Sequence, residues 1–351
     1  MGKQITSSNF GSLPSGHSVT RHAMQNANDI ALEVLNYGGI IKKLLLPNRE
    51  GILENCVLGY ANLEDYVVNP PYLGALVGRC ANRIAAGKLV FDDQAFPLAQ
   101  NLGKHHLHGG NKGFDKVIWR VEEKIEATAV VLTLTYTSPH LEEGYPGNLE
   151  LTVSYRLTDT NLLLVDYKAK TDRKTVVNLT QHSYFNLSGN LHQQVGDHQL
   201  RIPAEKILAV NDELIPTGDF LSVAATPFDF RQPKPIGQEL FSDHRLMQMG
   251  QGYDHCYCFD AEEQSLKPAA VLIHPQSGRK MEVSTTAPAM QLYTGNHLSD
   301  PFAPYTAVCL ETQGYPDSPN HPHFPSVVLV PGEEYHSTTQ FQFSTEESNT
   351  N

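Results

Sequence analysis

Three titratable side chains lie where apolar, strand-like runs give way to glycine-rich or proline-rich segments, and together they could carry acid–base chemistry. Glu311 ends an apolar run and is followed by residues 312–326, which include four prolines. Proline removes backbone donors and fixes φ, so this stretch is predicted to be a stiff loop. His182 follows the apolar run 174–180, and His108 precedes two glycines. A carboxylate ionised at neutral pH and an imidazole that titrates near it can serve as general base and general acid.

Three further polar residues could bind the molecule on which such a pair acts. Asn82 and Arg83 lie in residues 78–92, and Asp254 lies in residues 252–259. The guanidinium offers a planar fork of donors that suits hydroxyl or carboxylate oxygens. Any one of these side chains alone is more often a surface or structural group, so only the combined set indicates a site. The sequence contains no G-x-S-x-G elbow, phosphate-binding glycine loop or H-E-x-x-H motif. Proton transfer on a neutral, hydroxyl-rich ligand suits this set of residues.

The elements that must position these residues are predicted to be strands. Apolar and polar residues alternate through 149–157, a turn follows at 158–161, and a second apolar run begins at Leu162, so this region predicts a hairpin. Helical periodicity is nearly absent, with short turns expected near 62–66 and 235–240. The sequence therefore predicts an all-β fold.

The whole chain is expected to form one domain, because no linker or low-complexity tract interrupts it. We expect the ends, about residues 1–10 and 345–351, to be flexible.

Charge and cysteine usage narrow the classes of partner. Lys and Arg number 26 against 38 Asp and Glu, which gives a net charge of −12. Such a chain repels phosphate backbones and anionic lipid, so we expect neither nucleic acid nor a membrane surface as partner. No signal peptide is evident and the five cysteines have unmatched spacings, which predicts reduced thiols and a cytoplasmic protein. Cys256 and Cys258 are interpreted as strand packing rather than metal ligands. The sequence does not decide between a monomer and a homodimer.

Eight ordered segments resemble the galactose mutarotase family, whose members are also called aldose 1-epimerases. The resemblance extends from about residue 25 to residue 343 and is carried by ANRI at 81–84, LHGG at 107–110, KGFDK at 112–116, EEGYPGNL at 142–149, HSYFNLSG at 182–189, TPFDFR at 226–231, GYDH at 252–255 and the Glu311 segment with NHPHFPS at 320–326. It implies a large twisted antiparallel β-sandwich with few short helices, a sugar site in a cleft, and no metal or other cofactor.

The resemblance also implies a reaction and a role for each site residue. Free aldohexoses such as galactose and glucose would exchange between their α and β anomers by ring opening and reclosure. Glu311 would be the base that takes the proton of the anomeric hydroxyl, and His182 the acid that protonates the ring oxygen. His108 would bind the reacting end of the sugar. Sugar hydroxyls would be bound by the remaining three residues, Asn82, Arg83 and Asp254.

Three alternatives stay open at this point. His106 and His108 have the spacing that places both side chains on one face of a strand, so with a carboxylate they could hold a metal in a cupin-like site. A sugar-binding protein without catalysis could use the same scaffold. An epimerase acting on phosphorylated hexoses is disfavoured by the negative charge and the lack of a basic cluster.

Overall fold

The structure is a computed structural model that describes residues 2–68, 71–259 and 265–347. The described residues are mainly strands, with two short α-helices, α1 (Leu63–Val68) and α2 (Arg245–Gly250). This arrangement confirms the all-β prediction, and the expected helical turns appear as α1 and as the 3₁₀ turn Ile236–Gln238. None of the helices in this part of the chain is long and apolar enough to cross a membrane.

The largest element is a nine-stranded antiparallel sheet with the strand order β11-β12-β13-β14-β27-β23-β22-β17-β20. Its strands are β11 (Arg120–Ile125), β12 (Ala129–Ser138), β13 (Leu149–Thr158), β14 (Leu162–Thr171), β27 (Tyr335–Thr345), β23 (Arg279–Thr285), β22 (Lys267–Ile273), β17 (Gln199–Arg201) and β20 (Lys234–Pro235). The predicted hairpin is β13 and β14, which pair from Leu149 with Thr171 to Leu157 with Leu163. Burial alternates along β13 as the period-two pattern requires.

Two five-stranded sheets and four short strand pairs complete the fold. The first five-stranded sheet runs in chain order through β1 (Gln4–Ser12), β2 (Ser18–Gln25), β3 (Ala31–Leu35), β4 (Ile41–Pro47) and β5 (Leu53–Asn55). The second has the order β19 (Pro216–Ser222), β18 (Lys206–Val210), β21 (Asp254–Cys258), β24 (Ala289–Tyr293) and β25 (Cys309–Gln313). The pairs are β10 (His106–Leu107) with β7 (Arg83–Ile84), β15 (Thr175–Val176) with β26 (Val328–Leu329), β16 (Thr180–Gln181) with β6 (Leu76–Val77), and β8 (Lys88–Phe91) with β9 (Gln94–Pro97).

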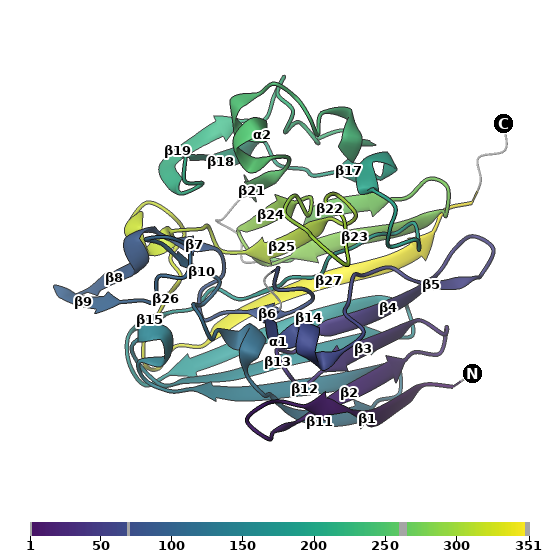
Figure 1. The fold of residues 1–351 in the computed structure, drawn as a ribbon, viewed down its shortest axis with the longest axis horizontal. Helices are drawn as coiled ribbons and strands as arrows, with labels where there is room; N and C mark the ends of the chain where they lie inside the picture. The colour runs from purple at the N-terminus through teal and green to yellow at the C-terminus, as the bar shows by residue number, and fades with distance from the viewer. Residues whose placement is uncertain (1, 69–70, 260–264, 348–351) are drawn as a thin grey trace.

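The core lies between the nine-stranded sheet and the sheet β1–β5. Leu32 and Leu44 of the smaller sheet belong to the same buried cluster as Leu132, Val153 and Val165 of the larger one. Two antiparallel sheets that share one apolar layer form a β-sandwich, because each sheet buries one face against the other. Figure 1 shows β2–β4 lying across β12–β14, so the expected sandwich is confirmed. The prediction that 1–351 forms a single domain stays a prediction.

The N-terminal segment differs from the sequence-based expectation of a flexible end. Residues 4–12 form β1, which pairs with β2 along most of its length, so the expectation for residues 1–10 is wrong from residue 4 onward. Ile5 packs against the main core and Phe10 against a second one, while the Lys3 ammonium lies 2.7 Å from an Asp159 oxygen. These contacts hold a segment whose polar composition alone suggests disorder. At the other end β27 reaches Thr345, and residues 348–351 lie outside the described residues.

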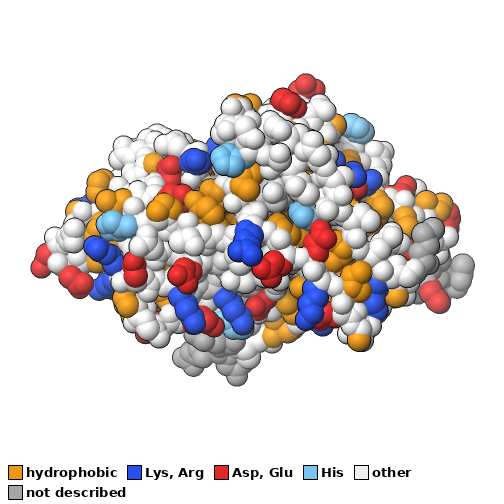
Figure 2. All heavy atoms as spheres, turned by 90° about the horizontal axis from the view of Figure 1, so that it is seen from below, with side chains coloured by type: hydrophobic (Ala, Val, Ile, Leu, Met, Phe, Trp, Pro, Cys, Tyr) orange, Lys and Arg blue, Asp and Glu red, His pale blue; other side chains and the backbone are white. Residues whose placement is uncertain are grey.

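The charged side chains are dispersed over the surface, and the cysteines lie in the interior. On the face shown in Figure 2, basic and acidic side chains lie interspersed, and no basic region gathers there. All five cysteines are unoxidised and buried. Cys256 and Cys258 lie within β21 and pack in the interior, which confirms their interpretation as strand residues.

Candidate active site

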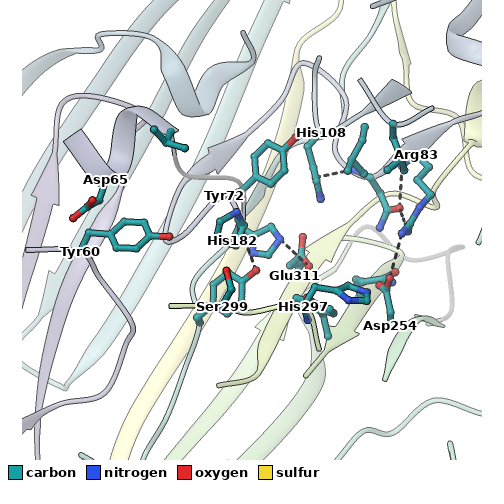
Figure 3. A pocket seen from close by; sticks show the side chains of 18 of the residues that line it. Tyr60, Asp65, Tyr72, Arg83, His108, His182, Asp254, His297, Ser299 and Glu311 are labelled. Atoms are coloured by element: carbon teal, nitrogen blue, oxygen red, sulfur yellow. Dashed lines mark hydrogen bonds and ion pairs between the residues drawn. The ribbon is translucent and has the colours of Figure 1, made fainter. Parts of the chain in front are cut away.

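One cavity of about 660 Å³ brings together all six residues singled out in the sequence. Asp254 begins β21 and Glu311 lies in the middle of β25, while Arg83 belongs to β7. His182 directly follows β16 and His108 directly follows β10. The prediction that Glu311 stands at the end of its strand is wrong by two residues, because β25 extends to Gln313. Figure 3 shows these side chains converging from different elements.

Glu311 and His182 form a close pair at the bottom of the cavity. Glu311 Oε1 lies 3.6 Å from His182 Nε2, and the two residues expose only 2% and 4% of their surface. Glu311 Oε2 and His182 Nδ1 are buried and have no hydrogen-bond partner within the described residues. Unpartnered buried polar atoms are costly, so a site that contains them is built to receive polar groups from a ligand.

Burial shifts the two pKa values in opposite directions. Loss of solvent, reinforced by the Asp254 carboxylate, raises the pKa of Glu311 to about 8 against the opposing charge of Arg83. Loss of solvent lowers the pKa of His182 to about 4. Ordinary values near 4.3 and 6.5 would leave Glu311 ionised and largely neutral His182 ready to gain a proton near pH 6. The folded site instead carries one proton between about pH 4 and pH 8, and without ligand that proton resides on Glu311.

A backbone hydrogen bond fixes the tautomer of His108. Asn82 donates its backbone N–H to His108 Nδ1 at 3.2 Å, so the neutral imidazole carries its proton on Nε2. Burial lowers the pKa of His108 well below its usual range, and the nearby His182 and Arg83 lower it further. One nitrogen of His108 lies within 4.8 Å of the ligand atoms of His182 and Glu311. His108 therefore offers a neutral N–H donor beside Glu311 and His182.

The glycines after His108 serve the fold in a way the sequence did not indicate. Gly109 has φ near +89°, and a Cβ there would lie 1.8 Å from the carbonyl oxygen of Gly78. The close approach is thus between two protein segments, and it packs the loop of His108 against the segment between β6 and β7 that leads to Asn82.

A second network binds the other polar residues to one another. Arg83 Nη2 lies 3.3 Å from Asp254 Oδ2, and Gln291 donates to Asp254 Oδ1 at 2.6 Å. Burial acts to raise the pKa of Asp254, but the Arg83 charge and the Gln291 hydrogen bond outweigh it and lower the pKa. Asn82 Oδ1 accepts the backbone N–H of Arg83 at 2.9 Å. Arg83 Nε and Gln291 Oε1 have no hydrogen-bond partner within the described residues, so both atoms could bind polar groups of a ligand.

Sequence reasoning missed several residues of this cavity. Gln291 lies on β24 opposite Glu311 on β25, a neighbourhood that only the strand register reveals. Tyr184 stands in the HSYFNLSG segment, and its ring stacks on His182 at 5.0 Å with an interplanar angle of 19°. Tyr72 lies nearly parallel to His182 at 6.3 Å and contacts the His108 ring at 4.7 Å. Aromatic faces attract a cation, so these rings favour the protonated form of His182 when it forms.

The alternative metal site of His106 and His108 is not formed. His106 Nδ1 bonds to the Ala99 carbonyl at 2.7 Å, and its Nε2 bonds to the Tyr145 hydroxyl at 2.6 Å. Both of its ring nitrogens are thus engaged away from His108, which turns out of β10 with φ near +50°.

Among the residues that the structure describes, two groups have the spacing of metal ligands, and hydrogen bonds weigh against metal binding in both. In the group of His108, His182 and Glu311, the Asn82 N–H occupies His108 Nδ1, so its other nitrogen holds the proton that a metal would have to displace. The second group is Asp197, His198 and His274.

In that second group the nitrogens facing Asp197 also carry protons. His198 Nε2 accepts the backbone N–H of Leu187 at 3.0 Å, and His274 Nδ1 accepts that of Ser277 at 3.1 Å. The remaining nitrogen of each ring therefore holds the proton and faces the Asp197 carboxylate, which clamps the two histidines together.

Several known proteins are similar to this chain in sequence and in fold. A sequence model of the family described as aldose 1-epimerase matches residues 20–342. The galactose mutarotase of Homo sapiens is 40% identical over 348 residues, covering 97% of this chain and 98% of that protein. The aldose 1-epimerase of Escherichia coli is 36% identical over 342 residues, covering 95% and 97%. The crystal structure of galactose 1-epimerase from Lactobacillus acidophilus has a TM-score of 0.88 at 30% identity, covering 99% of this chain and 100% of that one. The chain therefore belongs to the aldose 1-epimerase family.

Proposed function

We propose that this protein is a mutarotase that interconverts the α and β anomers of free aldohexoses such as galactose and glucose. The observation that carries the proposal is the buried pair of Glu311 and His182, whose Oε1 and Nε2 atoms are 3.6 Å apart. Their pKa values of about 8 and about 4 imply that the pair holds one proton near neutral pH. Anomer exchange needs one group to remove a proton from O1 and another to deliver a proton to O5. A pair with one shared proton supplies both functions without any net change in charge.

The proton balance of the reaction follows from that pair. In the reactive form Glu311 is a carboxylate and His182 is an imidazolium. Glu311 takes the O1 proton as His182 gives its proton to O5, the C1–O5 bond breaks, and C1 becomes an aldehyde carbon. After rotation about C1–C2, Glu311 returns a proton to the aldehyde oxygen while His182 takes back the proton of O5. The new C1–O5 bond gives the other anomer, and both residues regain their starting protonation.

The pKa shifts indicate where the proton of the pair lies before a sugar binds. With no ligand the proton rests on Glu311, which is also its position when the open-chain aldehyde is bound. Before ring opening, the proton must move to His182. Sugar hydroxyls that donate to Glu311 and the flanking faces of Tyr72 and Tyr184 favour that transfer, because they stabilise the carboxylate and the imidazolium. The site is therefore arranged to hold the open-chain intermediate most readily.

The other polar residues position the sugar. The Nε2–H of His108 is a neutral donor for an oxygen at the reacting end, where negative charge develops during proton transfer. Arg83, Asp254, Asn82 and Gln291 present donors and acceptors from one side of the cavity. Their fixed hydrogen bonds to one another leave defined free atoms for ring hydroxyls, which suits recognition of a polyhydroxylated ring.

The charges around the cavity favour an uncharged sugar over a phosphorylated one. Asp65 and Asp300 line the cavity and are exposed, and neither forms an ion pair within the described residues. Arg83 is the one guanidinium among the lining residues, and Asp254 already neutralises it. A phosphate dianion would meet uncompensated carboxylates at the opening, so this observation weighs against a hexose-phosphate epimerase.

Polarimetry tests the proposal directly. The optical rotation of freshly dissolved α-D-galactose and α-D-glucose is followed with and without the protein, in the presence of EDTA. We expect faster equilibration with either sugar and no effect of the chelator. If rotation changes no faster than in buffer while galactose still binds in calorimetry, the protein is a sugar-binding protein without catalysis.

The proposed cellular site is the cytoplasm, which the five buried, unoxidised cysteines support.

A further inference from the structure

Asp317 is a buried carboxylate that the proposed reaction does not use. It lies in the proline-rich loop after β25, directly before the 3₁₀ turn Ser318–Asn320, and exposes 3% of its surface. Its backbone has φ near +56°, a left-handed conformation that aspartate and asparagine tolerate better than most residues. A carboxylate is seldom buried unless its oxygens have partners, so its contacts indicate what it does.

Those contacts join the loop to the strand that carries Arg83. The backbone N–H of Asp317 donates to the Arg83 carbonyl at 2.9 Å, and Asp317 Oδ1 accepts the backbone N–H of Ala85 at 2.9 Å. The two bonds bracket Ile84, whose side chain is fully buried. Asp317 thereby takes the place of a neighbouring strand along an edge of β7, supplying a backbone donor and a side-chain acceptor.

Two further residues hold the carboxylate in this orientation. Asn320 Nδ2 donates to Asp317 Oδ1 at 2.5 Å, and His321 Nε2 lies 3.4 Å from Asp317 Oδ2. Both belong to the same loop, so the loop fixes the carboxylate before it meets β7. Asparagine at position 317 would keep an oxygen for Ala85 and would remove the negative charge beside His321.

The hydrogen bonds of Asp317 affect the cavity through the position of the Arg83 side chain. Backbone bonds on both sides of Ile84 set the position from which Arg83 extends toward Asp254, 3.3 Å away. The same loop continues from the strand of Glu311, so one segment links the position of the catalytic carboxylate to that of the guanidinium. Nothing in the contacts of Asp317 reaches Glu311, His182 or His108 directly.

We propose that Asp317 is a positioning residue that sets the affinity for the sugar by holding the segment of Arg83 in register with the strand of Glu311. This inference rests on the proposed function, because it assigns Arg83 to sugar binding. It separates affinity from chemistry. Loss of the Asp317 side-chain acceptor removes one of the two bonds that hold the segment of Arg83, while the backbone bond to the Arg83 carbonyl and the positions of Glu311 and His182 are kept. The expected signature is therefore a change in KM and Kd with kcat nearly preserved.

The test compares Asp317→Ala and Asp317→Asn with the unmodified protein in polarimetric kinetics on galactose. We expect Asp317→Ala to raise KM about 5–30-fold, since a hydrogen bond typically contributes about a 2- to 13-fold effect and the loosened guanidinium loses more than one. The expected change in kcat is less than about threefold. Asp317→Asn should restore most of the affinity, because its side-chain oxygen can still accept from Ala85 N–H.

A double-mutant cycle shows whether the effect passes through Arg83. In the Arg83→Ala background, Asp317→Ala should raise KM by less than about twofold, because the side chain it positions is gone. Ser318→Ala is the matched control: it removes the bond from Ser318 Oγ to the Pro325 carbonyl, 2.7 Å, in the same loop without touching residues 83–85. We expect Ser318→Ala to leave KM unchanged.

Binding measurements keep this inference separate from the proposed function. Galactose affinity is measured by calorimetry in the Glu311→Gln background, where turnover is not needed, and Asp317→Ala should weaken it by the same factor as KM. A protein that binds galactose but shows no mutarotation refutes the proposed reaction and leaves the role of Asp317 in affinity intact. Equal losses from Asp317→Ala with and without Arg83, or a fall in kcat alone, would refute the positioning role.

Discussion

Replacing Glu311 by Gln should make the protein more stable at alkaline pH while it removes the activity. Gln has nearly the shape of a protonated Glu, so the packing at this position is kept. The pKa of Glu311 is about 8 in the folded protein against 4.5 for the free side chain, because burial disfavours the carboxylate. The folded protein thus keeps a proton that the unfolded chain has lost, and stability falls as the pH rises from about 4.5 through about 8.

The size of the effect follows from those two values. At pH 5 the ionisation of Glu311 in the unfolded chain destabilises the fold by about 1 kcal/mol, and at pH 8 by about 4 kcal/mol. The variant cannot ionise, so the difference in unfolding free energy between Glu311→Gln and the unmodified protein should grow by about 3 kcal/mol between these pH values. The pKa of His182 is about 4 in the folded protein, so this imidazole is neutral between pH 5 and pH 8 and its contribution is the same in both proteins.

Chemical denaturation at pH 5 and pH 8 measures this difference. Glu150→Gln is the matched control, because Glu150 lies on the exposed side of β13 and should give the same small difference at both pH values. If the advantage of Glu311→Gln does not increase with pH, the carboxyl is not held protonated by burial. The reasoning that assigns the resting proton to Glu311 would then be wrong.

Further predictions concern catalysis at the same site. Glu311→Gln and His182→Ala should each lower kcat about 10²–10⁴-fold with the fold intact, and near-normal turnover in polarimetry for either would remove that residue from the mechanism. The pH profile of kcat/KM should be flat between about 4 and 8, falling above 8 as Glu311 loses the shared proton and below 4 as His182 gains a second; a profile that rises through pH 8 would contradict the shared proton. His108→Asn should raise KM and lower kcat by about tenfold each, and unchanged kinetics would exclude His108 from sugar contact.

The all-β architecture was predictable because it depends on local patterns, and the meeting of the six site residues was expected from the resemblance to the galactose mutarotase family. The alternation of apolar and polar residues through 149–157 predicts a strand with one buried face, and β13 is buried on one face in the structure. His182 and His108 directly follow short strands, and such positions at element ends favour a functional side chain, whereas Glu311 lies two residues before the end of β25. Their roles in catalysis remain predictions that the experiments above test.

The protonation states of Glu311 and His182 could not be predicted from the sequence, because they depend on how several elements together bury these side chains. Ordinary pKa values assign an ionised Glu311, and the folded cavity reverses that assignment by removing water from around it. No local sequence pattern marks Gln291 as a site residue, because its position opposite Glu311 results from the register of β24 and β25. The strand at residues 4–12 was hidden for the same reason: its stability comes from pairing with β2 rather than from its own composition.

The position of β27 has a consequence for how the protein is made. This strand, Tyr335–Thr345, lies between β14 and β23 in the nine-stranded sheet and pairs with both. Until residue 345 has left the ribosome, the strands β11–β14 and the strands β23, β22, β17 and β20 remain two separate half-sheets with unpaired edges. In the nascent chain the edge of β14 is therefore open after residue 171 and that of β23 after residue 285, so chaperones that shield strand edges are expected to matter most between the synthesis of β23 and that of β27.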